Sequence, residues 1–147
     1  MTQKWYIAGP WFTPRQDEIL QMVKAALDHE RSPYYSPKDE ALFVEGKTFD
    51  AKEVFQSNID AILNCGVVIV ITDGKDIGTI FEAGVAYASN IPILYFWCDH
   101  GDSPLNLMLA QSGHTVALGM DQLTRDLAIY RDCDESLPRT DYSGKQE

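Results

Sequence analysis

The chain has 147 residues and a formal net charge of -10 at pH 7, with 45% hydrophobic and 23% charged residues. This length and composition are typical of one globular domain with a core, and the negative charge argues against nucleic acid polymers and anionic membranes as partners. The sequence has neither an apolar run of the ~18 residues that a membrane span needs nor the hydrophobic region of a signal peptide. Its three cysteines are odd in number and far apart, which argues against a disulfide framework. We therefore expect a cytoplasmic protein. The negative net charge does not exclude small molecules as ligands.

Apolar strands alternate with helices along the chain. Residues 4–8 predict a short buried strand that ends at Gly9. Thr13, Pro14 and Gln16 then supply an N-cap hydroxyl, a proline for the first helical position and the glutamine of a capping box, so a helix should begin here. The later elements expected are a short strand at 34–37, a loop at 41–49, a helix at 51–64, a strand at 66–72, a helix at 79–89, a strand at 91–97, a short helix near 106, a strand at 115–118 and a helix at 121–131.

The strand at 66–72 is β-branched and apolar on both faces, as expected of a central strand in a parallel sheet. Strands that alternate with helices imply a parallel sheet covered on both faces. We therefore predict one α/β domain at residues 1–131, with a flavodoxin-like (Rossmann-like) sheet of five parallel strands, and an extended tail at 132–147. The ligand crevice of such a fold opens at the carboxyl ends of the first and third strands, so residues 9–12 and 73–78 should border the site.

Glu82 is the most informative candidate for catalysis. It stands in a helix of apolar and small residues, where a carboxylate costs several kcal/mol unless it is paired, hydrogen-bonded or near solvent. Thr79 and Glu82 also fit a capping box, a structural role that contributes about 1 kcal/mol. Asp76 precedes the same helix and fits an N-cap equally well. Together at the predicted crevice, however, two carboxylates suit glycosyl transfer, and the helix N-terminus would hold Glu82 ionised as a nucleophile.

Other candidates have two readings each. Asn58 lies on the apolar stripe of its helix. It is either a core amide that is hydrogen-bonded to the backbone or a residue that contacts a ligand. Tyr6, Trp11 and Phe12 cluster near the end of the first strand, where aromatic rings either join the core or stack on a planar base. The sequence lacks phosphate-binding and dinucleotide-binding glycine motifs, a nucleophile elbow and zinc-ligand spacing. We therefore expect neither a cofactor nor a metal.

Four segments together resemble the motifs of the nucleoside 2-deoxyribosyltransferases. They are 6–12 (YIAGPWF), 36–40 (SPKDE), 76–84 (DIGTIFEAG) and 106–108 (NLM). The pattern D-x-G-T-x-x-E-x-G is the most specific of them, and the resemblance extends over about 5–116. It implies a flavodoxin-like subunit that moves 2-deoxyribose from one base to another by a double displacement. The implied partners are a 2′-deoxynucleoside donor and a free purine or pyrimidine base as acceptor.

The resemblance also implies a role for each matching residue. Glu82 would form a covalent deoxyribosyl intermediate, Asp76 would contact the leaving base and help protonate it, and Tyr6 would orient Glu82. Asn106 would hold the 5′-hydroxyl from a neighbouring subunit, so a homo-oligomer (dimer, tetramer or hexamer) with a shared site is expected. The full set of expected substrate-binding residues is Gly9, Trp11, Phe12, Asp39, Glu40, Asn58, Asn106 and Met108.

Two positions depart from the family pattern. Asn58 stands where family members carry an aspartate that helps bind the base, and an amide can donate as well as accept but cannot release a proton. The usual amide of the base pocket is not evident at Asp39, Glu40 and Ala41. A C-terminal segment can reach into a neighbouring site in this family, and Tyr142 is the candidate here.

Two other functions stay open. An N-glycosidase that hydrolyses 2′-deoxynucleoside 5′-monophosphates would need serines, an arginine or a helix terminus for the phosphate. Asn106 and the scarcity of basic residues near the motifs favour an uncharged 5′-hydroxyl instead. A non-catalytic nucleotide-binding module on the same fold would not need an ionised Glu82 beside Asp76.

Overall fold

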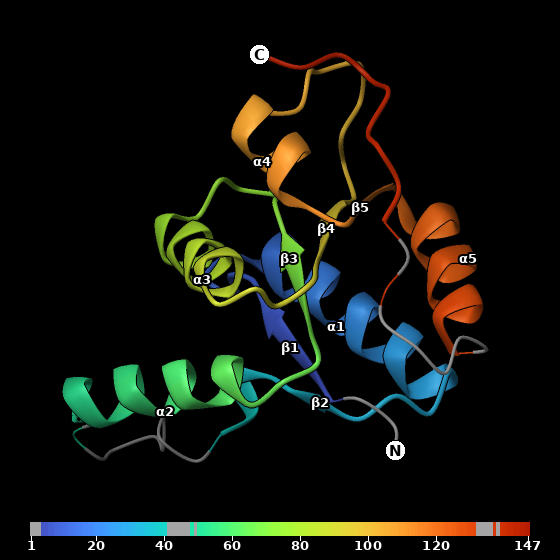
Figure 1. Ribbon diagram of the computed structural model, residues 1–147. Coiled ribbons are helices and arrows are strands. Elements are labelled where there is room, and N and C mark those ends of the chain that lie inside the picture. The colour runs from blue at the N-terminus through green and yellow to red at the C-terminus, as the bar shows by residue number, and fades with distance from the viewer. Residues whose placement is uncertain (1–3, 41–47, 49, 132–136, 138) are drawn as a thin grey trace.

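The computed structural model describes residues 4–40, 48, 50–131, 137 and 139–147. Five parallel strands form one sheet in the order β2-β1-β3-β4-β5, and helices cover both of its faces (Figure 1). The strands are β1 (Trp5–Ala8), β2 (Tyr34–Tyr35), β3 (Val67–Ile71), β4 (Ile93–Trp97) and β5 (Thr115–Leu118). The helices are α1 (Pro14–His29), α2 (Ala51–Leu63), α3 (Ile77–Ala88), α4 (Leu107–Ser112) and α5 (Met120–Arg131), with a 3-10 turn η1 (Pro37–Asp39). The predicted flavodoxin-like fold is confirmed.

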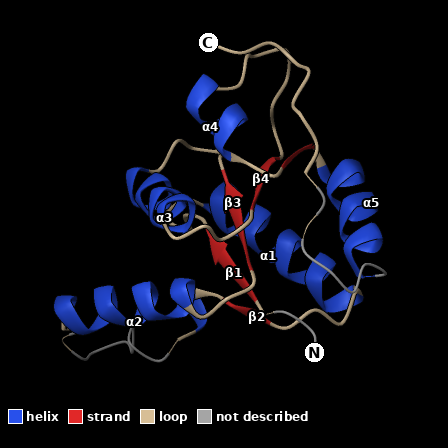
Figure 2. Cartoon of the chain, in the orientation of Figure 1, coloured by secondary structure: helices blue, strands red, loops and turns tan. Residues whose placement is uncertain are grey.

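Side chains alternate between two cores, one on each face of the sheet. On β1, Trp5 and Ile7 join the core beneath α1 and α5, whereas Tyr6 and Ala8 join the core on the side of α3. Figure 2 shows helices on both sides of the strands. All five residues of β3 are buried because both faces are covered, as its continuous apolar sequence predicted.

The first helix begins as expected, and the third does not. Thr13 Oγ1 accepts from the Gln16 N–H at 3.2 Å, while Gln16 Oε1 accepts from the Thr13 N–H at 3.1 Å, which completes the capping box. The N-cap of α3 is Asp76, whose Oδ2 accepts from the Thr79 N–H at 2.8 Å. The helix therefore starts at Ile77, and the expected capping box from Thr79 to Glu82 is wrong.

The segment after β2 is also shorter and tighter than expected. The strand ends at Tyr35, and η1 replaces the rest of the strand expected at 34–37. Two oppositely directed ion pairs fasten η1 to α1, Lys24 with Asp39 at 2.7 Å and Lys38 with Asp17 at 2.5 Å. The loop expected at 41–49 lies outside the described residues apart from Thr48.

The helix α2 extends away from the sheet (Figure 1). All of its residues are described, and Ile62 is the one that is buried. Phe55 of this helix is 54% exposed. None of the described helices is both long and apolar enough to cross a membrane.

The described part of the C-terminal segment runs beside the loop that precedes α4. The Leu105 N–H donates to the carbonyl of Lys145 at 2.9 Å, and the Leu107 N–H donates to that of Glu147 at 2.7 Å. Leu105 and Gln146 form a parallel bridge. Residues 145–147 thus lie against the N-terminus of α4.

Candidate active site

Glu82 faces the sheet from the inner stripe of α3, which also carries the buried residues Thr79, Ala83 and Ala86. Its carboxylate accepts a hydrogen bond from the hydroxyl of Tyr6. Tyr6 is fully buried in β1, so a strand side chain fixes one oxygen of a helix carboxylate. The pairing joins the first strand to the helix that follows the central strand, at the switch point of the sheet.

Burial dominates the electrostatics of Glu82. The pKa of the carboxyl group is raised from 4.5 to about 7: burial is the largest cause, the hydrogen bond from Tyr6 lowers the pKa, and the charge of Asp76 raises it. Glu82 is the sixth residue of α3, beyond the first turn in which a helix terminus stabilises an anion. The expectation that the helix N-terminus keeps Glu82 ionised is therefore wrong. Near pH 7 the group is divided between its two protonation states.

Asp76 caps α3 and also lies near Glu82. Its Oδ2 accepts from the Thr79 N–H at 2.8 Å and from the Thr79 hydroxyl at 2.9 Å. Both described contacts use the same oxygen. Asp76 also lies close enough to Glu82 for its charge to raise the pKa of that group. The site therefore holds two carboxyl groups, one fixed by a strand tyrosine and one by a helix cap.

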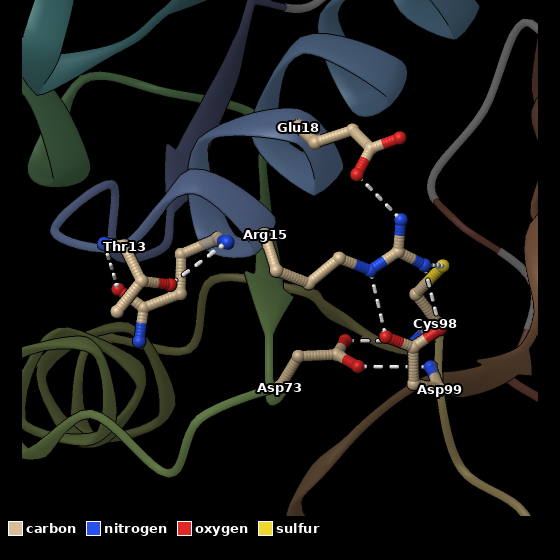
Figure 3. A network of polar contacts seen from close by, with 7 residues as sticks. Thr13, Arg15, Glu18, Asp73, Cys98 and Asp99 are labelled. Atoms are coloured by element: carbon tan, nitrogen blue, oxygen red, sulfur yellow. Dashed lines mark hydrogen bonds and ion pairs between the residues drawn. The ribbon is translucent and has the colours of Figure 1, made fainter.

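Side chains tie together the loops that border this site. The carboxylate of Asp73 accepts the N–H groups of Cys98 and Asp99, both at 2.8 Å, and so links the loop after β3 to the end of β4. Arg15 of α1 donates to both carboxylate oxygens of Asp99, at 2.9 and 2.7 Å, and to Glu18 at 2.8 Å (Figure 3). The loop that presents Asp76 is thus anchored at its base.

Two glycines allow close approaches at the same edge of the sheet. A Cβ on Gly9 would lie 2.8 Å from Cδ1 of Ile71, because the ends of β1 and β3 meet there. Gly74 has a φ of +83°, and its Cβ would lie 2.7 Å from Nε2 of Gln16. Gln16 also accepts from the backbone of Phe12 at 3.0 Å, so it contacts both bordering loops.

Asn58 is half-buried and connects to the carboxylate through Tyr35. The Tyr35 hydroxyl donates to Asn58 Oδ1 at 3.4 Å, and the Tyr35 ring stacks on Tyr6 with centroids 5.5 Å apart and planes 11° apart. Sequence reasoning missed Tyr35 as a site residue. The available signal was its position in the strand next to β1, but the register that pairs Tyr6 with Tyr35 is a tertiary property.

Four of the expected substrate-binding residues make other contacts in the described structure. Asp39 bonds to Lys24 of α1, as described above. Trp11 packs against the core on the side of α1 and α5, and its ring lies 5.3 Å from that of Phe12, which is 71% exposed. Glu40 borders an open cavity of about 580 Å³ together with Lys4 and Tyr35.

Asn106 and Met108 belong to the entrance of α4. Asn106 is the N-cap of this helix and accepts from the Met108 N–H at 3.0 Å, and the Met108 side chain is 71% exposed. Among the described residues, Asn106 lines a cavity of about 290 Å³ with Lys75, Ile80 and others, but Glu82 does not line it. Tyr142 packs against the core of its own subunit on the side of α3.

Known proteins share this sequence pattern and this fold. The sequence profile of the family described as nucleoside 2-deoxyribosyltransferase matches residues 5–119. No curated protein matches significantly. A conserved protein from Enterococcus faecalis V583 is 20% identical, with a TM-score of 0.75 over 88% of this chain and 99% of that one. A 2-deoxyribosyltransferase from Bacillus psychrosaccharolyticus is 24% identical, with a TM-score of 0.71 over 95% and 98%. A CMP N-glycosidase from Clostridium botulinum is 14% identical, with a TM-score of 0.63 over 87% and 99%.

Proposed function

Because the chain belongs to the nucleoside 2-deoxyribosyltransferase family, we propose that it transfers 2-deoxyribose from a 2′-deoxynucleoside to a free nucleobase. The observation that carries this proposal is the half-buried carboxyl group of Glu82, which accepts a hydrogen bond from Tyr6, lies near Asp76 and has a pKa of about 7. Retaining glycosyl transfer uses one carboxylate as the nucleophile and a second carboxyl group that handles the proton of the leaving group.

In the first step, the Glu82 carboxylate attacks C1′ on the face opposite the base. The C1′–N bond breaks with its electron pair going to the base, and Asp76 contacts the base and relays a proton from solvent to its nitrogen as it leaves. In the second step, a nitrogen of the acceptor base attacks C1′, the ester bond to Glu82 breaks, and the acceptor's proton passes to Asp76. The Tyr6 hydroxyl stabilises the Glu82 carboxylate before the attack and after its release.

A homo-oligomer with a shared site is part of this proposal. The outward stripe of α3 exposes apolar side chains, with Ile77 86%, Phe81 54% and Tyr87 62% exposed. Phe55 of α2 extends this stripe, since its ring lies 6.1 Å from that of Phe81. Apolar patches of this kind mark protein interfaces, and this one lies on the helix that carries Glu82. In this proposal a second copy covers the patch, and the family resemblance assigns Asn106 and Met108 of that copy to the sugar.

The second candidate function is hydrolysis of a 2′-deoxynucleoside 5′-monophosphate. One observation favours it, because Lys75 lines the same cavity as Asn106 and would offer a cation to a 5′-phosphate. In that reaction water, rather than a second base, would accept the sugar.

The deciding experiment incubates the purified protein with thymidine or deoxyinosine, with and without free adenine, and separates the products by chromatography. Deoxyadenosine that forms only with added adenine supports transfer. Base released at the same rate without an acceptor supports hydrolysis, and deoxynucleoside 5′-monophosphates are then compared as substrates. Absence of reaction with every donor overturns the enzyme proposal in favour of a nucleotide-binding module.

A further inference from the structure

Tyr35 touches three residues around the candidate site. It pairs with Tyr6 in the parallel register of β2 and β1, and the two rings stack nearly parallel, 5.5 Å between centroids and 11° between planes. Its hydroxyl donates to Asn58 Oδ1 at 3.4 Å, and the ammonium group of Lys4 lies 5.6 Å from its ring centroid. Tyr35 therefore contacts an aromatic ring of β1, an amide of α2 and the ammonium group of Lys4.

The stacked ring of Tyr35 packs against one face of the Tyr6 ring. β2 has two residues and is the edge strand of the sheet, so Tyr35 supplies the aromatic surface on this side of Tyr6. The Tyr6 hydroxyl donates to Glu82, and the nearly parallel stacking on Tyr35 favours one plane for the Tyr6 ring.

We infer that Tyr35 is a positioning residue, which aligns the Tyr6 hydroxyl with Glu82 through ring stacking. Tyr35 acts on the carboxylate through Tyr6. Its importance for catalysis rests on the proposed function, whereas its effect on Glu82 does not.

The charged and titratable groups in this region come from several elements. Asp76 on α3 and Tyr6 on β1 act on Glu82, Cys65 lies near Tyr6, and Glu40 acts on Tyr35. Because the bond from Tyr6 lowers the pKa of Glu82, a misaligned Tyr6 should leave that pKa higher. Entry of water into the site would instead lower the pKa of Glu82. The direction in which this pKa changes in a Tyr35 variant therefore distinguishes a misaligned Tyr6 from a hydrated site.

The test titrates Glu82 by ¹³C NMR of protein labelled at glutamate carboxyl carbons, with the signal assigned by Glu82→Gln. In Tyr35→Leu the midpoint should rise by about half a pH unit or more, whereas in Tyr35→Phe, which keeps the ring, it should stay at the wild-type value. Tyr34→Leu is the matched control, since Tyr34 packs against the opposite core from the same strand. Its midpoint should not move.

The decisive comparison repeats Tyr35→Leu in a Tyr6→Phe background. If Tyr35 acts through the Tyr6 hydroxyl, Tyr6→Phe alone raises the midpoint and Tyr35→Leu adds nothing to it. An equal shift in both backgrounds, no shift in either, or a downward shift overturns the inference. Tyr35→Met replaces the leucine variant if that variant does not fold, as judged by circular dichroism.

A kinetic readout completes the test. If the protein transfers deoxyribose, Tyr35→Leu should lower kcat about tenfold with a small change in KM, and the acidic limb of the pH profile should move up with the NMR midpoint. The NMR titration needs no substrate. Failure of the proposed function therefore leaves the positioning inference testable, and an unmoved NMR midpoint in an active enzyme overturns the inference alone.

Discussion

Glu82 and Tyr6 stand 76 residues apart in sequence and meet in one hydrogen bond, between a helix and the strand beneath it. The bond stabilises the ionised carboxylate, while burial opposes ionisation more strongly, so the pKa of Glu82 settles at about 7. This balance makes the proposed nucleophile sensitive to pH within the physiological range, and the sign of that dependence can be predicted.

Deoxyribosyl transfer should increase with pH through about 7, because only the ionised form of Glu82 attacks C1′. Initial rates at saturating donor, measured from pH 5 to pH 9, give the profile of kcat. In Tyr6→Phe the acidic limb should move to higher pH, since the hydrogen bond that lowers the pKa is lost. A rate that is flat from pH 6 to pH 8 would show that ionisation of Glu82 does not limit the reaction.

Replacement of Glu82 should abolish transfer without unfolding the protein. Glu82→Gln keeps the size of the side chain and an oxygen for the Tyr6 hydroxyl, but an amide cannot form the glycosyl ester. We expect kcat to fall by several orders of magnitude, a loss typical of a deleted nucleophile. Mass spectrometry of quenched wild-type reactions should reveal one deoxyribosyl group on the peptide that contains Glu82. Full turnover by the variant would refute the assignment.

The stability of the same variant should rise relative to that of the wild type as pH increases. The pKa of Glu82 is raised on folding from 4.5 to about 7, so the folded state binds this proton more tightly than the unfolded state. Wild-type stability therefore falls as pH rises from about 4.5 to 7, whereas glutamine does not titrate. We compare the free energy of unfolding of Glu82→Gln with that of the wild type at each pH. This difference should shift in favour of the variant by on the order of 2 kcal/mol between pH 4 and pH 8. Urea unfolding at both pH values measures this, and a difference that is independent of pH would contradict it.

Gly74 offers a test of the link between the bordering loops. Alanine there must adopt a φ of +83° and meet Nε2 of Gln16, 2.7 Å from the new Cβ. Gly101→Ala is a matched control, since its φ is +54° and nothing lies within 4 Å of its Cβ position. Each should lose about 1 kcal/mol of stability to backbone strain. Only Gly74→Ala should also raise KM, because Gln16 holds the backbone of Phe12. Equal kinetic effects would show that the contact with Gln16 is unimportant.

The sequence predicts the parallel sheet well because buried strands and capped helices are local signals. The capping box at Thr13 is readable in four residues, and the structure contains it. The start of α3 was predicted wrongly, since Asp76 and Thr79 are both good N-caps and local pattern does not choose between them.

The site is harder to predict because its contacts are not local. Tyr35 reaches Tyr6 through strand register, which no single segment encodes. The pKa of Glu82 depends on the depth of its burial, a property of the packed domain, so its position near a helix N-terminus predicts more complete ionisation at pH 7 than a pKa of about 7 allows. Motif spacing finds the carboxylates, and tertiary packing sets their chemistry.

Asn106 provides the test of a site shared between subunits. As the N-cap of α4 it accepts from the Met108 N–H, a contact that aspartate can also make, so Asn106→Asp should preserve the helix while it removes the amide donor. If Asn106 serves the neighbouring site, Asn106→Asp and Glu82→Gln subunits that are each inactive should complement one another. In a dimer mixed at equal ratio, half of the molecules would be heterodimers with one intact site, and activity should return to about a quarter of the wild-type value. The control mixes the two variant proteins under conditions in which their subunits do not exchange, and it should remain inactive. No recovery after exchange would mean that Asn106 and Glu82 act in the same subunit.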